Sequence, residues 1–144
     1  MLRRHLHSFL LRSPAERLLL IKAWCILAGV RAGLSVLPFR LFRVLFGRIR
    51  VAMGARRDKA ALPSIAHLVW AVRSASVYVP HATCLTQALA AQVLLERCGY
   101  PTRLVIGVAP DHNGEAAFQA HAWLESEGVV VIGDSAVKYV PLTT

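Results

Sequence analysis

Residues 83–99 have the sequence TCLTQALAAQVLLERCG, which is the pattern of one α-helix with a signal at each end. Thr83 can cap the unpaired backbone N–H groups of the first turn, and Gly99 can take the left-handed conformation that ends a helix. Between them, apolar residues recur at helical spacing at Leu85, Leu89 and Val93. We therefore predict a helix whose first residue is Cys84.

This position makes Cys84 a candidate nucleophile. A thiol there faces unpaired N–H donors and the positive end of the helix dipole, and both favour the thiolate over the thiol. The backbone N–H of the same residue is a candidate oxyanion donor. Cys25 and Cys98 are expected to be small core residues, which is the more common role of a cysteine with apolar neighbours.

A β-hairpin is predicted for residues 119–134, where two strand-like runs flank the dipeptide Glu127-Gly128. The dipeptide is typical of a two-residue turn with glycine at its second central position. Such a turn pairs Ser126 with Val129. Every other cross-strand pair then follows from this one, and a slip of one residue would change them all.

In that register His121 stands directly opposite Asp134, with Cβ atoms about 4.5–5.5 Å apart. A carboxylate beside a histidine can hold the imidazole in one orientation, and the imidazole can then act as a base. Together with Cys84, the two residues would form a nucleophile, a base and an orienting group. The sequence therefore predicts a Cys-His-Asp arrangement.

The charge of the chain is unevenly distributed. Residues 1–59 contain thirteen basic and two acidic residues, whereas residues 60–144 contain four basic and six acidic ones. The 144 residues are 56% hydrophobic, and this length suits one domain. We expect a basic, apolar helical segment at residues 1–62 and a core at residues 63–144, joined in one compact unit.

The first predicted helix begins at Ser13-Pro14-Ala15-Glu16, which combines a capping box with a proline in the first turn. It is expected to end near Gly29 or Gly33. Lys22 and Arg31 divide its apolar run into pieces too short to span a bilayer. We therefore expect no membrane crossing, and contact with a membrane surface is left open.

The remaining elements complete an α+β fold. Amphipathic or apolar helices are predicted after Pro38 and after Pro63, and the segment 78–82 is predicted to be extended. A strand at residues 102–109 joins the hairpin in a small antiparallel sheet, and residues 137–142 can add an edge strand. The predicted fold is a nucleophile helix packed on this sheet, preceded by amino-terminal amphipathic helices.

Three motifs in this order resemble the leader peptidase of lasso-peptide biosynthesis: CLTQAL at residues 84–89, AHAWLE at residues 120–125 and VIGD at residues 131–134. That family belongs to the transglutaminase-like branch of the papain-like cysteine proteases. The resemblance covers roughly residues 63–134. It implies a papain-like, transglutaminase-like core.

The resemblance also implies an activity and partners. Cys84 would be the nucleophile, His121 the general base and then acid, and Asp134 the group that orients the histidine. The enzyme, a hydrolase, would cut a ribosomally made precursor and release its leader, so that an ATP-using cyclase can close the macrolactam ring. The chain resembles the stand-alone protease, which works with a separate leader-recognition protein. The precursor and that protein are expected partners, and the cyclase is a further candidate.

Composition and charge indicate which partners, compartment and cofactors to expect. The basic helices of residues 14–50 are the candidate docking surface for the leader, the recognition protein or lipid. Nucleic acid is not expected, because the arginines there alternate with apolar residues at helical spacing. Three cysteines without a C-x-x-C pair favour a reducing cytoplasm, with membrane association left open. No cofactor or metal is expected, since His5 and His7 lack companion ligands.

Substrate contacts and alternative functions are also predicted from the sequence. Tyr78, His81 and Trp123 are candidate substrate-binding residues. The first alternative function keeps the same three catalytic residues but transfers the acyl group to an amine, or deamidates. The second is a non-catalytic basic protein that acts as a scaffold or at a membrane surface.

Overall fold

The structure is a computed structural model that describes residues 12–53, 62–110, 118–135 and 139–142. Within these ranges four helices precede four strands, which confirms the predicted α+β class. The helices are α2 (Pro14–Val36), α3 (Phe39–Met53), α4 (Ile65–Ser76) and α5 (Cys84–Arg97). The strands are β1 (Arg103–Pro110), β2 (Phe118–Ser126), β3 (Val129–Ile132) and β4 (Val140–Pro141).

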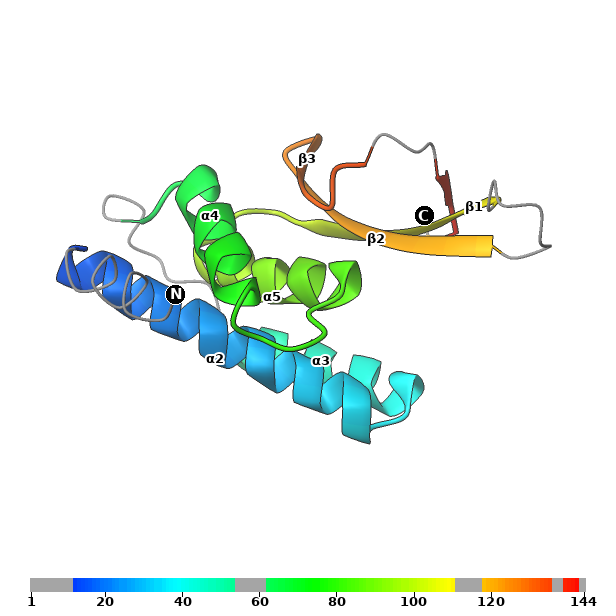
Figure 1. The fold of residues 1–144 in the computed structure, drawn as a ribbon, viewed down its shortest axis with the longest axis horizontal. Helices are drawn as coiled ribbons and strands as arrows, with labels where there is room; N and C mark the ends of the chain where they lie inside the picture. Colours follow the sequence, from blue (N-terminus) through cyan, green and yellow to red (C-terminus); the bar gives the residue numbers. More distant parts are fainter. Residues whose placement is uncertain (1–11, 54–61, 111–117, 136–138, 143–144) are drawn as a thin grey trace.

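Helix α5 lies at the centre of the molecule. Figure 1 shows it between the sheet on one side and α2 and α3 on the other, with α4 beside it. Because α5 is covered from several directions, its residues 88–95 are all buried. Three of these eight residues are alanines, which let neighbouring elements approach closely. The core therefore surrounds the helix that begins at the candidate nucleophile.

Both end signals of α5 act as predicted. The Thr83 side chain accepts a hydrogen bond from the Thr86 backbone N–H at 3.4 Å, and the helix begins at Cys84. Gly99 has φ of 80°, in the left-handed region that glycine adopts without strain. Local sequence signals therefore define this helix.

Helix α2 begins as predicted but ends later. The capping box of Ser13 and Glu16 is formed, yet the helix continues past Gly29 and Gly33 to Val36. A Cβ at Gly33 would lie 2.8 Å from the ring of Phe42. This glycine therefore allows α3 to pack closely, and the expectation that it ends the helix is wrong.

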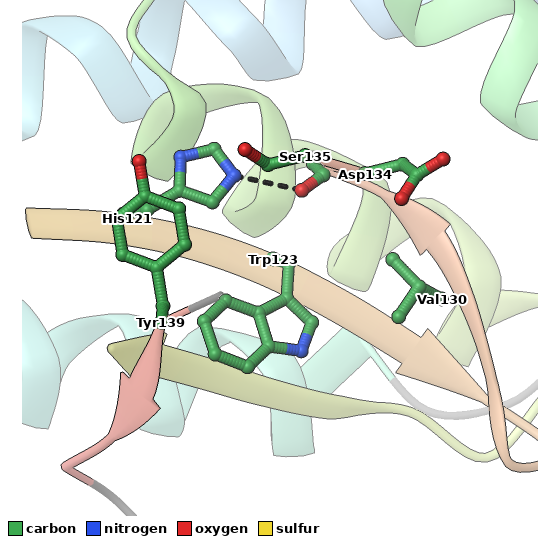
Figure 2. A pocket seen from close by; sticks show the side chains of 7 residues that line it. His121, Trp123, Val130, Asp134, Ser135 and Tyr139 are labelled. Atoms are coloured by element: carbon green, nitrogen blue, oxygen red, sulfur yellow. Dashed lines mark hydrogen bonds between the residues drawn. The ribbon is translucent and has the colours of Figure 1, made fainter. Parts of the chain in front are cut away.

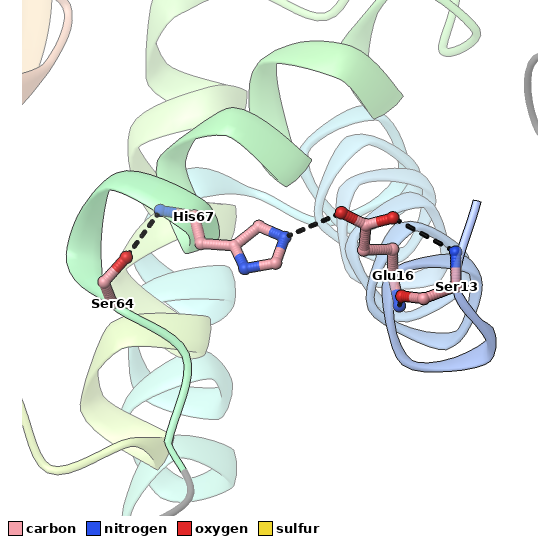
Figure 3. A network of polar contacts seen from close by, with 4 residues as sticks. All are labelled: Ser13, Glu16, Ser64 and His67. Atoms are coloured by element: carbon pink, nitrogen blue, oxygen red, sulfur yellow. Dashed lines mark hydrogen bonds and ion pairs between the residues drawn. The ribbon is translucent and has the colours of Figure 1, made fainter.

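The start of α2 is joined to the start of α4. Glu16 accepts a hydrogen bond from the Ser13 backbone N–H at 3.2 Å and lies 3.9 Å from the His67 ring (Figure 3). The Arg12 guanidinium carbon lies 4.6 Å from the centre of the Trp70 ring. These contacts attach the basic amino-terminal segment to the core.

The sheet is antiparallel, with strand order β3-β2-β1-β4. Leu104 pairs with Leu124 in the β1–β2 ladder, and Leu124 is fully buried in the cluster formed with the helices. Side chains alternate between the two faces of a strand, so His121 and Trp123 project from the face that α5 does not cover. The short edge strand β4 contains Pro141, which fits the predicted edge position.

The predicted hairpin forms, but only part of its register is right. Glu127 and Gly128 have φ of 52° and 80°, the positive values of a type I′ turn. Ser126 pairs with Val129 as predicted. The register then shifts by one residue at a bulge, so that Leu124 pairs with Ile132.

The bulge overturns the predicted pairing of His121 with Asp134. It leaves Val131 as an extra residue, and Val131 and Ile132 both contact the helix cluster. Burial of two successive apolar residues therefore outweighs regular alternation. Strand β3 ends at Ile132, and Gly133, with φ of 82°, turns the chain out of the ladder.

Candidate functional site

Cys84 occupies the first position of α5, and its side chain is half-buried. The segment before it is held by Gln87, whose Nε2 donates to the Ala82 carbonyl at 3.2 Å. Cys98 is also half-buried, but Cys25 is exposed, so its predicted core position is wrong. Cys25 lies on the side of α2 that faces away from the other helices.

The approach to Cys84 is a series of turns, and the predicted extended segment is wrong. The backbone N–H of Tyr78 donates to Ala75 at 3.1 Å, and that of Ala82 donates to Val79 at 3.3 Å. Val77 keeps helical dihedrals, so the chain continues to turn after α4. His81 has φ of 56°, a left-handed conformation uncommon outside glycine. Both Tyr78 and His81 are exposed, and their role in substrate binding stays a prediction.

The His121 ring is oriented by a backbone carbonyl. Its Nε2 lies 2.7 Å from the Gly133 oxygen (Figure 2). A carbonyl oxygen can only accept, so Nε2 carries the hydrogen and donates. In the neutral ring Nδ1 then holds the lone pair. This nitrogen has no hydrogen-bond partner among the described residues, and it is the atom that can act as a base.

Asp134 does not contact the imidazole. Its side chain is exposed, and Figure 2 shows the carboxylate directed away from the His121 ring. In this structure the carbonyl of the preceding residue, Gly133, occupies the place that the sequence assigned to the carboxylate. A backbone group has no sequence signature, and the only available hint was the glycine next to the aspartate.

Two aromatic side chains form a cluster with the imidazole, and their own ring centroids are 6.5 Å apart. The Tyr139 ring stacks on His121 with centroids 4.9 Å apart, and the Trp123 ring is stacked at 6.3 Å. Trp123 Nε1 donates to Glu125 at 3.0 Å, and the Tyr139 hydroxyl bonds to Gln119 at 3.1 Å. Sequence reasoning missed Tyr139, because its contact depends on β4 lying beside β1.

These side chains line a pocket on the outer face of the sheet (Figure 2). Its walls also include Val130, Gly133, Asp134 and Ser135. Trp123 therefore lies beside His121, although its role in substrate binding stays a prediction. The pocket combines one imidazole with two aromatic walls and an exposed carboxylate.

Cys84 does not line the pocket that contains His121. Helix α5 packs on the opposite face of β2, and within the described residues no hydrogen bond joins the thiol to the ring. Helix α5 and strand β2 end at the same end of the molecule. There Ser126, the last residue of β2, donates to the carbonyl of Pro101, which follows α5, at 2.8 Å. The starts of α5 and β2, which carry Cys84 and His121, therefore lie toward the other end of the molecule.

The fold and the cysteine define a class of protein. A cysteine at the start of a capped helix is in a position that favours its use as a nucleophile in covalent catalysis. Residues 33–144 match the model of the Transglutaminase-like superfamily, and the chain belongs to that superfamily. The chemistry of this superfamily is generally cysteine-based, as in cysteine proteases and acyltransferases.

The match extends beyond the predicted core. It begins inside α2 and includes the whole of α3, so it starts thirty residues before residue 63. No significant match was found among curated proteins or among solved structures.

Proposed function

We propose that this chain is a cysteine protease that removes the leader from a ribosomally synthesised lasso-peptide precursor, together with a separate leader-recognition protein. The observation that carries the proposal is the capped start of α5 at Cys84 within a transglutaminase-like chain. The order of the CLTQAL, AHAWLE and VIGD motifs, which resembles the lasso leader peptidases, supports the substrate class.

Cys84 is the nucleophile in the proposed reaction. Its thiolate attacks the carbonyl carbon at the leader–core junction, and the oxyanion accepts a hydrogen bond from the Cys84 backbone N–H. One such donor contributes about 3–4 kcal/mol. His121 takes the proton of the thiol to form this thiolate, and when the C–N bond breaks it gives that proton to the departing amine, so that a thioester remains. His121 then takes a proton from water, which hydrolyses the thioester and restores the thiol.

The tautomer of His121 suits this role. Donation from Nε2 to the Gly133 carbonyl leaves Nδ1 as the basic nitrogen. Asp134 follows Gly133 directly, so a local rotation of that segment would exchange the carbonyl for the carboxylate. The proposal assigns the carboxylate the task of stabilising the imidazolium that forms during the reaction.

The proposed reaction requires contact between Cys84 and His121, and no hydrogen bond joins the two side chains in the structure of the chain alone. We expect binding of the recognition protein and the precursor to bring the thiol and the imidazole into contact. The free chain is therefore expected to lack peptidase activity.

The test mixes the chain with the recognition protein and the precursor encoded beside it, and reads the product masses. We expect two fragments from the three-component mixture, and an intact precursor when the recognition protein is omitted. Cys84→Ala should abolish cleavage, lowering the rate by at least about a thousandfold. Cys25→Ala, which removes an exposed thiol on the outward face of α2, should leave the rate unchanged.

Other products would contradict the proposal in distinct ways. A single product of altered mass with an intact chain would identify an acyltransferase or a deamidase. Cleavage that Cys84→Ala leaves unchanged would mean that the thiol is not catalytic. No reaction in the complete mixture, with the chain folded, would favour the non-catalytic alternative.

A further inference from the structure

The outward face of α2 is apolar along nearly its whole length. Residues on this face recur every three or four positions and carry no charged side chain. They form the outer stripe, which consists of Leu18, Ile21, Cys25, Gly29, Ala32 and Val36, all of them exposed. At 1.5 Å per residue the stripe is about 27 Å long. The opposite face packs in the core through Ala23, Leu27 and Val30.

Helix α3 also exposes apolar side chains. Its Phe42 is buried against α2, but Leu41, Val44 and Leu45 are 54%, 58% and 45% exposed. Figure 1 shows α2 and α3 together as the layer farthest from the sheet. An exposed apolar surface of this extent on a folded protein indicates that something covers it.

The charges around the surface identify what covers it. Residues 12–53 contain eight basic residues and one acidic residue, Glu16, which belongs to the capping box. Lys22, Arg40 and Arg43 are exposed and pair with no carboxylate in the described part of the chain. Apolar side chains bordered by unpaired cations match the interface of an anionic bilayer, where acyl chains lie beneath charged headgroups.

We propose that the layer formed by α2 and α3 lies on the surface of an anionic lipid bilayer. The outer stripe and the exposed apolar residues of α3 enter the headgroup boundary, and the arginines bind the lipid phosphates. Trp24, which is 47% exposed beside the stripe, adds an amphipathic ring of the kind that favours this depth. The sheet and its pocket then face away from the membrane.

The helix lies on the bilayer and does not cross it. By length and composition α2 could span a membrane, with a mean hydropathy of 1.6 over its most apolar window. Its inner face, however, carries Ala23 and Leu27, which are fully buried against α4 and α5. Crossing would pull these side chains out of the core and place Lys22 within the hydrocarbon.

Flotation of the full-length chain with lipid vesicles tests the proposal. We expect the chain to float with vesicles of mixed phosphatidylcholine and phosphatidylglycerol, and not with phosphatidylcholine alone. Leu18→Glu/Ile21→Glu should weaken binding by at least about a hundredfold. Arg40→Gln/Arg43→Gln should weaken it by about thirtyfold, and added salt should do the same. The matched control is Val77→Glu, which changes a 78% exposed valine at the end of α4 and should leave binding unchanged.

The native thiol in the stripe gives a second measurement. A membrane-impermeant maleimide should label Cys25 quickly in solution and at least about tenfold more slowly once anionic vesicles are added. Equal labelling with and without vesicles, or equal binding by the double glutamate variant, would overturn the proposal. Failure to float together with dimerisation through the stripe would also overturn it. So would failure to float together with protection of Cys25 from the maleimide by the recognition protein alone.

Discussion

At the scale of single residues, the backbone of Gly133 positions the candidate site. Its carbonyl holds the His121 ring at 2.7 Å, and its φ of 82° turns the chain out of the sheet. A Cβ at this position would lie 2.6 Å from the Ala122 carbonyl oxygen. The residue is therefore required to be glycine both for its conformation and for the close approach of two backbones.

Gly133→Ala is predicted to destabilise the fold more than the same change at Gly128. Both residues have φ near 80°, so each alanine incurs roughly 1–2 kcal/mol of conformational strain. At Gly133 the added Cβ would also clash with the Ala122 carbonyl oxygen, whereas nothing lies within 4 Å of a Cβ at Gly128. We expect a loss of about 3 kcal/mol or more at Gly133. Urea unfolding of both variants measures the difference, and equal losses would contradict the close approach.

At the scale of elements, the start of α5 places the candidate nucleophile. The Thr83 side chain accepts from the Thr86 backbone N–H and lies 3.1 Å from the Thr86 hydroxyl. This cap holds the first turn and therefore the backbone N–H of Cys84. Caps depend on residues within one turn, which explains why this part of the site was predictable from the sequence.

Thr83→Ala is predicted to lower the free energy of unfolding by about 1 kcal/mol, the usual loss for an N-cap. Thr83→Ser keeps the accepting oxygen and should retain most of the stability. Thermal and urea unfolding of the two variants provide the comparison. If serine destabilises as much as alanine, the hydroxyl does not act as the cap.

At the scale of the whole molecule, the basic amino-terminal segment is part of the main core. Helix α2 contributes Ala23 and Leu27 to the same cluster that contains Leu68 of α4 and Leu95 of α5. The charge difference between the two halves of the sequence is therefore a difference between surfaces of one folded unit. The outer stripe is the opposite side of a helix that the core holds in place.

Leu27→Ala is predicted to cost about 2–5 kcal/mol, because Leu27 is fully buried. Leu18→Ala on the same helix should cost less than about 0.5 kcal/mol, because Leu18 is 52% exposed. Both variants should unfold in one transition that includes α4 and α5. A Leu27→Ala variant with an unchanged main transition would show that α2 unfolds separately.

The sequence alone determined the features that depend on neighbouring residues. The α+β class, the caps of α2 and α5 and the turn at Glu127-Gly128 all follow from signals a few residues long. Each uses a local hydrogen bond or a local dihedral preference, so no distant contact is needed to form it.

Only the tertiary structure decided the features that depend on distant contacts. Burial of Val131 and Ile132 against the helices created the bulge that moved Asp134 away from His121. Phe42 packs on Gly33, and α2 continues past its expected end. Burial of Ala23, Leu27 and Val30 leaves Cys25 on the exposed face of the helix. In each case apolar burial against a remote element outweighed a local preference, because the area removed from water stabilises more than one turn or pair can.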